Sequence, residues 1–155
     1  MSKIITLDEA AGLRARYRTR VFTNGVFDLL HVGHVRCLQA ARALGDCLIV
    51  GLNSDESARA LKGEGRPLTP QDERAEILAA LACVDYVVIF DALTAEHAVE
   101  VIQPDVYVKG GDYGPGGKVP PEAQAAAAYG GRVEFIPYVA SRSTSRLIAR
   151  LQEHF

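Results

Sequence analysis

The sequence predicts an α/β fold built on an open parallel sheet of five strands, with helices on both faces. Three observations support this. Short apolar runs alternate with helix-like segments along the 155 residues. The run at residues 47–52 (C-L-I-V-G-L) is continuously apolar, as expected of a strand covered on both faces. Glycine and proline fall between the segments. This alternation is typical of a Rossmann-like sheet in a single domain, residues 1–155.

Helix and strand signals follow one another through the first half of the chain. The segment T-L-D-E, from Thr6 to Glu9, has the form of a capping box, and Gly45 is a plausible helix stop. The expected elements are a helix at 6–16, a strand at 20–23, a helix at 31–44, a strand at 47–52, a helix at 54–61 and a loop at 62–68.

The second half repeats the alternation. Thr69 is expected to cap a helix whose first residue is Pro70. The expected elements are this helix to about residue 82, a strand at 86–90, a helix at 94–102, a strand at 106–108, a glycine-rich loop at 109–121, a helix at 122–129, a strand at 132–136 and a helix at 143–153.

Composition excludes several classes of protein. The 17 basic and 19 acidic residues nearly balance, so nucleic acid is not an expected partner. No segment approaches the ~20 apolar residues of a membrane span, and the N-terminus lacks the apolar core of a signal peptide. Cys37, Cys47 and Cys83 fit neither a disulfide framework nor a Cys-x-x-Cys metal site, so buried thiols are expected. A cytoplasmic protein, without a membrane partner, is predicted.

Residues 23–34 (T-N-G-V-F-D-L-L-H-V-G-H) join the first strand to a helix and contain the most unusual pattern. His31 and His34 lie three apart, so both face one side of the helix start. Gly33 between them lets a ligand approach the backbone, and a helix N-terminus attracts anions. This combination favours a phosphate site. A metal pair or ordinary surface histidines are the alternatives, and no third ligand with suitable spacing is apparent.

Three further segments follow the ends of predicted strands, where open parallel sheets bind ligands. Lys62, Arg66 and Arg74 form a basic set suited to phosphates, or else a solvated loop. The segment K-G-G-D-Y at 109–113 suggests backbone packed against a ring or a phosphate, with a plain turn as the alternative. Hydroxyls at 143–145 either cap the last helix or bind phosphate.

Familiar motifs of other enzyme classes are absent. The chain has no G-x-x-x-x-G-K-[ST] loop, which argues against an ordinary kinase or GTPase. It has no G-x-G-x-x-G after the first strand, so a dinucleotide cofactor is not expected. It also lacks the nucleophile elbow of a Ser/His/Asp hydrolase.

The segment at 23–34, with its H-V-G-H, resembles the signature of the cytidylyltransferase-like superfamily, and S-T-S at 143–145 resembles its second signature. The chain is most similar to the adenylyltransferase domain of bacterial ADP-heptose synthases. Segments in common include L-I-V-G-L-N-S-D, L-K-G-E-G-R-P-L, D-E-R-A-E-I-L-A-A-L and P-D-V-Y-V-K-G-G-D-Y. They run in order over about residues 21–150. Two places differ from the family pattern: Ser141-Arg142, where a glycine is usual, and the loop at 114–121.

The resemblance implies a nucleotidyltransferase fold and the transfer of AMP from ATP to D-glycero-β-D-manno-heptose 1-phosphate. Mg²⁺ would enter with ATP, with no metal ligands from the protein. A homodimer is expected, and a separate upstream sugar kinase, because 155 residues leave no room for the kinase domain often fused to the family. The implied catalytic residues are His31, His34, Lys62 and Arg66. The implied nucleotide-binding residues are Asn24, Gly25, Phe27, Gly33, Lys109, Gly110, Gly111, Asp112, Ser143, Thr144 and Ser145. The implied acceptor-binding residues are Asp28, Asn53, Asp55 and Arg74.

Two other functions stay open at this point. One is a CTP-dependent enzyme of the same superfamily that acts on glycerol 3-phosphate or a similar small phosphate. The other is a nucleotide-binding module without catalytic activity. The K-G-G-D-Y and R-P-L segments favour the heptose branch, and the presence of both histidines with the basic loop favours an enzyme. The histidine signature is also similar to that of class I aminoacyl-tRNA synthetases, but the chain is too short for their tRNA-binding domains.

Overall fold

A computed structural model of the chain describes residues 2–111, 118–137 and 143–154. Its centre is a five-stranded sheet in the order β3-β2-β1-β4-β5, and every neighbouring pair is parallel. The strands are β1 (Arg20–Gly25), β2 (Cys47–Asn53), β3 (Tyr86–Phe90), β4 (Val106–Gly110) and β5 (Arg132–Ile136). The predicted open parallel α/β fold is therefore confirmed.

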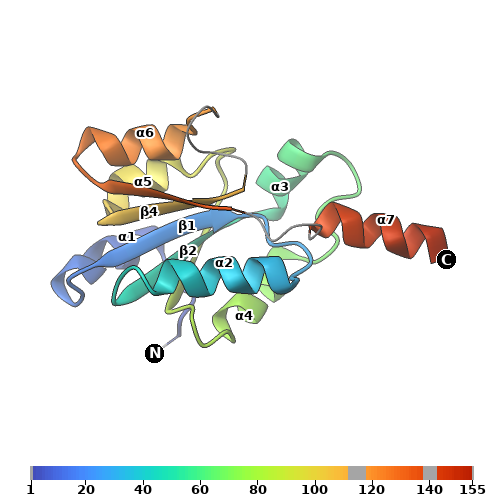
Figure 1. Cartoon of the computed structure of the whole chain (residues 1–155), viewed down its shortest axis with the longest axis horizontal. Coiled ribbons are helices and arrows are strands. Elements are labelled where there is room, and N and C mark those ends of the chain that lie inside the picture. Colours follow the sequence, from blue (N-terminus) through green and yellow to red (C-terminus); the bar gives the residue numbers. More distant parts are fainter. Residues whose placement is uncertain (1, 112–117, 138–142, 155) are drawn as a thin grey trace.

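Helices cover both faces of this sheet (Figure 1). Helices α1, α5 and α6 lie on one face, α2 and α4 lie on the other, and α7 extends away from the edge where β1 ends. Their bounds are α1 (Leu7–Gly12), continued by a 3-10 turn (Leu13–Ala15), α2 (Val32–Arg42), α3 (Asp55–Lys62), α4 (Gln71–Ala79), α5 (Glu96–Ile102), α6 (Pro121–Ala128) and α7 (Thr144–His154). Among the described residues, no helix is long and apolar enough to cross a membrane.

Two apolar clusters fill the space between the sheet and its helices. Phe22, Ile49 and Tyr107 belong to the cluster under α1, α5 and α6, while Leu48 and Val50 belong to the cluster under α2 and α4. Every residue of β2 is buried, as its apolar sequence predicts. The three cysteines are free thiols, and Cys47 is buried, but Cys37 and Cys83 are only partly so. The expectation of three buried thiols is therefore wrong for these two.

Two helix boundaries differ from the sequence-based expectation. Pro70, not Thr69, is the N-cap of α4, and the Asp28 carboxylate accepts a hydrogen bond from the Thr69 N–H at 3.0 Å. Helix α2 ends at Arg42 with Ala43 as its C-cap, two residues before Gly45. Gly45 meets a different requirement, since a side chain there would collide with the Thr19 carbonyl oxygen.

The strand order changes direction between β1 and β4. Connections leading to β2 and β3 run one way from β1, and those leading to β4 and β5 run the other way. The ladder between β1 and β4 is short, with Val21 opposite Val106 and Phe22 opposite Tyr107, although both strands continue beyond it. In open α/β sheets, ligands bind at such a switch point, outside the carboxyl ends of the strands.

Candidate active site

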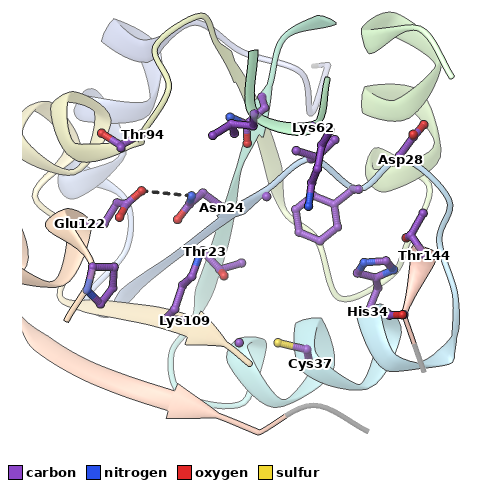
Figure 2. Close-up of a pocket in the computed structure, with 18 of the residues that line it drawn as sticks. Thr23, Asn24, Asp28, His34, Cys37, Lys62, Thr94, Lys109, Glu122 and Thr144 are labelled. Atoms are coloured by element: carbon purple, nitrogen blue, oxygen red, sulfur yellow. Dashed lines mark hydrogen bonds between the residues drawn. The ribbon is translucent and has the colours of Figure 1, made fainter. Parts of the chain in front are cut away.

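A cavity of about 610 Å³ opens at this switch point. Figure 2 shows side chains that reach it from β1, β4 and the first turns of α2, α6 and α7. Pockets of several hundred cubic ångströms accommodate small-molecule substrates. Of the predicted site residues, those that line it are Asn24, Gly25, Phe27, Asp28, His31, Gly33, His34, Asn53, Lys62, Arg66, Lys109, Gly110, Ser143, Thr144 and Ser145. The structure thus brings together most of the residues that the sequence singled out.

His31 and His34 form the start of α2. His31 is the N-cap, and its Nδ1 accepts a hydrogen bond from the Gly33 N–H at 3.1 Å. The Nδ1 of His34 accepts from the His31 N–H at 3.3 Å, and the two ring centroids are 3.9 Å apart. A neutral imidazole that accepts at Nδ1 carries its proton on Nε2. Both rings are therefore in the tautomer that offers an Nε2–H donor, at a helix terminus that already favours anions.

Burial, and to a smaller extent the neighbouring His31, lowers the pKa of His34 to about 4. His34 is therefore neutral at neutral pH, where it donates a hydrogen bond without carrying a charge. The unfolded chain binds this proton with the ordinary histidine pKa of 6.5. The group therefore carries no stability cost above that pH, and it destabilises the fold progressively as the pH falls from 6.5 toward 4.

We expect NMR titration of the His34 ring to give a midpoint near 4. A midpoint near the ordinary histidine value of 6.5 would contradict the burial that makes His34 a neutral donor.

Phe27 gives the turn after β1 its shape. Its φ is 48°, in the left-handed region that bulky residues avoid, and such a backbone costs roughly 1–3 kcal/mol. Its ring lies 5.4 Å from the His34 ring, and it packs so close to Gly25 that a Cβ there would approach within 2.9 Å. Gly25 and the turn at Phe27 therefore place an aromatic wall beside the two histidines.

Asp28 lies on the pocket wall, and its carboxylate is held by the loop after α3. It accepts hydrogen bonds from the N–H groups of Leu68 and Thr69 at 2.9–3.0 Å, and from Arg66 Nε at 2.9 Å. Burial works to raise the pKa of Asp28, yet these hydrogen bonds and the Arg66 charge leave it below 3.8. Asp28 thus fixes the loop that carries Arg66, and it holds the Arg66 side chain on the pocket wall.

An Asp28→Asn variant should lose stability in a pH-dependent way. The depressed pKa of Asp28 means that its stabilising contribution is present above 3.8 and disappears as the pH falls through the folded-state value. Urea unfolding should therefore show a clear difference between wild type and variant at neutral pH, and a smaller one below 3.8. A difference that stays constant over this range would show that the carboxylate charge does not hold the loop.

Cations occupy the middle of the pocket. In Figure 2, Lys62 and Lys109 approach the open space from opposite sides. Burial lowers the pKa of Lys109, Lys62 lowers it further, and Glu122 works against both. Two lysines close enough to influence each other, with Arg66 nearby on the wall, create a site suited to several phosphate groups.

Arg74 and Asp55 are predicted to contact the acceptor, but the structure does not place them among the residues that line the pocket. Arg74 is only 1% exposed, although it is a charged residue. Its guanidinium donates to the carbonyls of Val26, Asn53 and Thr69 at 2.7–2.8 Å, and to Asp55 Oδ1 at 2.8 Å. These hydrogen bonds connect the end of β2 and the turn after β1 to α4. Arg74 therefore stabilises the segments that carry the pocket residues.

The first turn of α7 closes one end of the pocket. The Thr144 hydroxyl donates to the Leu29 carbonyl at 3.0 Å, and the Ser143 hydroxyl accepts from the Arg146 N–H at 3.1 Å. The hydroxyls therefore cap the helix and anchor it to the turn after β1. Capping and phosphate binding are compatible at a helix N-terminus, so the predicted role of residues 143–145 remains a prediction.

Glu122 lines the pocket, and sequence reasoning missed it. It lies in the first turn of α6, where an acidic residue is ordinary because it complements the helix dipole. Only the fold shows that it faces the end of β1, where its carboxylate meets the Asn24 side chain (Figure 2). Thr94, which also lines the pocket, had no distinguishing signal either.

No group of three or more His, Cys, Asp or Glu side chains within residues 2–111, 118–137 and 143–154 is arranged to hold a metal ion. Gly111 is described and has a left-handed φ of 102°. Asp112, which was expected to contact the nucleotide, lies outside the described residues.

Comparison with known proteins gives consistent matches. A cytidylyltransferase-like family model matches residues 22–118, more than half of the chain. The chain is 56% identical over 154 residues to the bifunctional protein HldE of Citrifermentans bemidjiense, and 53% identical to that of Geobacter metallireducens. Each alignment covers 97% of this chain but 31% of the relative. The chain therefore spans about a third of the length of these relatives.

Solved structures agree with the fold. A lipopolysaccharide core biosynthesis protein from Thermoplasma volcanium matches with a TM-score of 0.62 and 27% identity, over 78% of this chain and 96% of that one. Pantoate-β-alanine ligase from Francisella tularensis matches with a TM-score of 0.61 over 94% of this chain and 69% of that one. The second match has 13% identity, so it supports the fold alone.

Proposed function

This chain belongs to the cytidylyltransferase-like family and is a nucleotidyltransferase, and from that premise we propose that it transfers AMP from ATP to D-glycero-β-D-manno-heptose 1-phosphate. The products are ADP-heptose and pyrophosphate. The observation that carries the proposal is the pair of Nε2–H donors at the start of α2, in a pocket whose charged side chains are mostly cationic. The similarity to HldE proteins over nearly the whole chain supports the heptose acceptor.

The proposed reaction is a direct in-line displacement. An oxygen of the sugar 1-phosphate attacks the α-phosphorus of ATP, and the bond from that phosphorus to the bridging oxygen breaks. The electron pair leaves with pyrophosphate. A phosphate nucleophile is already ionised at neutral pH, so no side chain has to remove a proton. Catalysis then consists of positioning and of stabilising charge on the oxygens of the transferred group.

Each part of the pocket has a proposed task. His31 and His34 donate hydrogen bonds to the phosphate chain. Lys62, Arg66 and Lys109 balance the negative charge that develops on the leaving pyrophosphate. Residues 143–145 hold the β- and γ-phosphates, and Gly25, Phe27, Gly33 and Gly110 line the nucleotide cleft. Mg²⁺ enters bound to ATP and is held mainly by its phosphates. A homodimer completes the proposal, and a sugar kinase activity supplies the sugar 1-phosphate.

Pyrophosphate release tests this function. Purified chain with Mg²⁺ is supplied with ATP or CTP, each crossed with the heptose 1-phosphate or glycerol 3-phosphate. The proposal predicts release only with ATP and the heptose phosphate. Release only with CTP and glycerol 3-phosphate would overturn the substrates and keep the reaction class. Binding of ATP with no release for any pair would favour a module without catalytic activity.

A further inference from the structure

Glu122 is a buried carboxylate at the edge of the pocket. It is 5% exposed, and its Oε1 accepts the Ala95 N–H at 3.0 Å and the Asn24 amide at 3.5 Å. Within the described part of the chain, both of its hydrogen bonds use this one oxygen. An ionised carboxylate offers about four acceptor positions. Glu122 therefore has acceptor capacity left on the side that lines the pocket.

Asn24 places a hydrogen-bond donor beside this acceptor. The Tyr107 hydroxyl donates to Asn24 Oδ1 at 2.7 Å, which fixes the orientation of the amide. The NH₂ group is consequently turned toward Glu122, as the dashed line in Figure 2 shows. An amide nitrogen has two N–H donors, and only one can be directed at Glu122. Thr94 adds a hydroxyl to the same end of the pocket.

A carboxylate beside an amide donor is suited to neighbouring hydroxyl groups. One hydroxyl donates to the carboxylate, and its neighbour accepts from the amide. A phosphate at this position would be repelled by the carboxylate, and an apolar group would leave buried polar atoms without partners. The chemistry at this end of the pocket therefore matches a diol, of which the reaction offers two sources: the acceptor sugar and the ribose of ATP.

The geometry of the reaction favours the acceptor sugar. His34 and Thr144 lie at the opposite end of the pocket from Glu122, Asn24 and Thr94 (Figure 2). In an in-line displacement, the attacking oxygen enters opposite the leaving group. If the phosphate chain of ATP lies along α2 and α7, the acceptor approaches from the side of α5 and α6, where Glu122 lies.

We propose that Glu122, oriented together with Asn24, binds a pair of neighbouring hydroxyl groups on the acceptor sugar and so determines acceptor specificity. This inference rests on the proposed function, and it assigns Asn24 to the acceptor rather than to the nucleotide, which the family resemblance implies. It assigns to Glu122 a contact with the neutral part of the substrate, whereas the histidines and lysines act on its phosphate groups.

The test is a Glu122→Gln variant, because glutamine keeps the shape of the side chain and an oxygen that can accept the hydrogen bond from the Ala95 N–H. Loss of a charge-assisted hydrogen bond should raise the KM for the heptose phosphate by about 10- to 100-fold. The kcat and the KM for ATP should stay close to those of wild type. Glu76→Gln on the exposed surface of α4 is the matched control, and it should change none of these values.

The outcomes separate the possibilities. An unchanged KM for the heptose phosphate in a folded variant overturns the inference, and so does an increase confined to the KM for ATP. If the substitution raises the KM for ATP but not the KM for 2′-deoxy-ATP, the diol is that of the ribose. Wild-type protein that makes no ADP-heptose overturns the proposed function itself, which is a distinguishable result. If Glu122→Gln does not fold, Tyr107→Phe tests the same contact through Asn24, and an unchanged KM for the heptose phosphate then counts against the inference.

Discussion

Replacing His34 by alanine should lower turnover by about 10²-fold or more, the cost of removing one preorganised donor to the transition state. His34 is neutral because burial holds its pKa at about 4, and its Nδ1 is engaged by the His31 N–H, so its Nε2–H is the group that alanine removes. The effect should appear in kcat more than in the KM for ATP, because this donor acts most strongly as charge develops on the transferred phosphate.

His97→Ala is the control for this experiment. His97 lies on α5 with a 72% exposed side chain, outside the pocket. Circular dichroism and the melting temperature would establish that both variants are folded. Full turnover by a folded His34→Ala variant would remove His34 from the mechanism, whereas a comparable loss in His97→Ala would point to a general effect of histidine removal.

Replacing Arg74 by methionine should destabilise the protein by about 3 kcal/mol or more, because it leaves buried carbonyls and a carboxylate without their donor. Arg74 donates to three carbonyls and to Asp55, and it is almost completely buried. Methionine fills much of the same volume, so lost hydrogen bonds rather than a cavity should dominate. For a chain of this size, the melting temperature should fall by roughly 6–12 °C.

Urea unfolding of Arg74→Met beside Arg59→Met checks this expectation. Arg59 lies on the exposed side of α3, where methionine should change the free energy of unfolding by less than about 0.5 kcal/mol. If Arg74→Met were as stable as wild type but lost affinity for the sugar phosphate, Arg74 would be a binding residue, as the sequence first suggested.

The sequence was sufficient for the fold and for most of the pocket wall. Continuous apolar strands alternating with capped helices predict the parallel sheet, and the carboxyl ends of its strands then locate His31, His34 and Lys109 at a common edge. These inferences succeed because the local apolar pattern predicts each strand and helix. Parallel pairing of the strands then brings the residues at their carboxyl ends close together in space.

Residues whose role depends on distant partners could not be assigned in this way. Nothing in the pattern of α4 distinguishes an arginine that faces substrate from one that binds the carbonyls of Val26 and Asn53, which lie 48 and 21 positions away. Asp28 similarly holds a loop 40 positions later in the chain. Glu122 has the appearance of an ordinary first-turn acid until α6 is placed beside β1.

The measurement that tests the central claim most directly follows two labels of ATP through the reaction. Purified chain is incubated with Mg²⁺, the heptose 1-phosphate, and ATP labelled with ³²P at either the α- or the γ-phosphate. Transfer of AMP predicts that the α-label appears in ADP-heptose and the γ-label in pyrophosphate. Appearance of the γ-label on the sugar, or of neither label in any product, would contradict a nucleotidyltransferase acting on this acceptor.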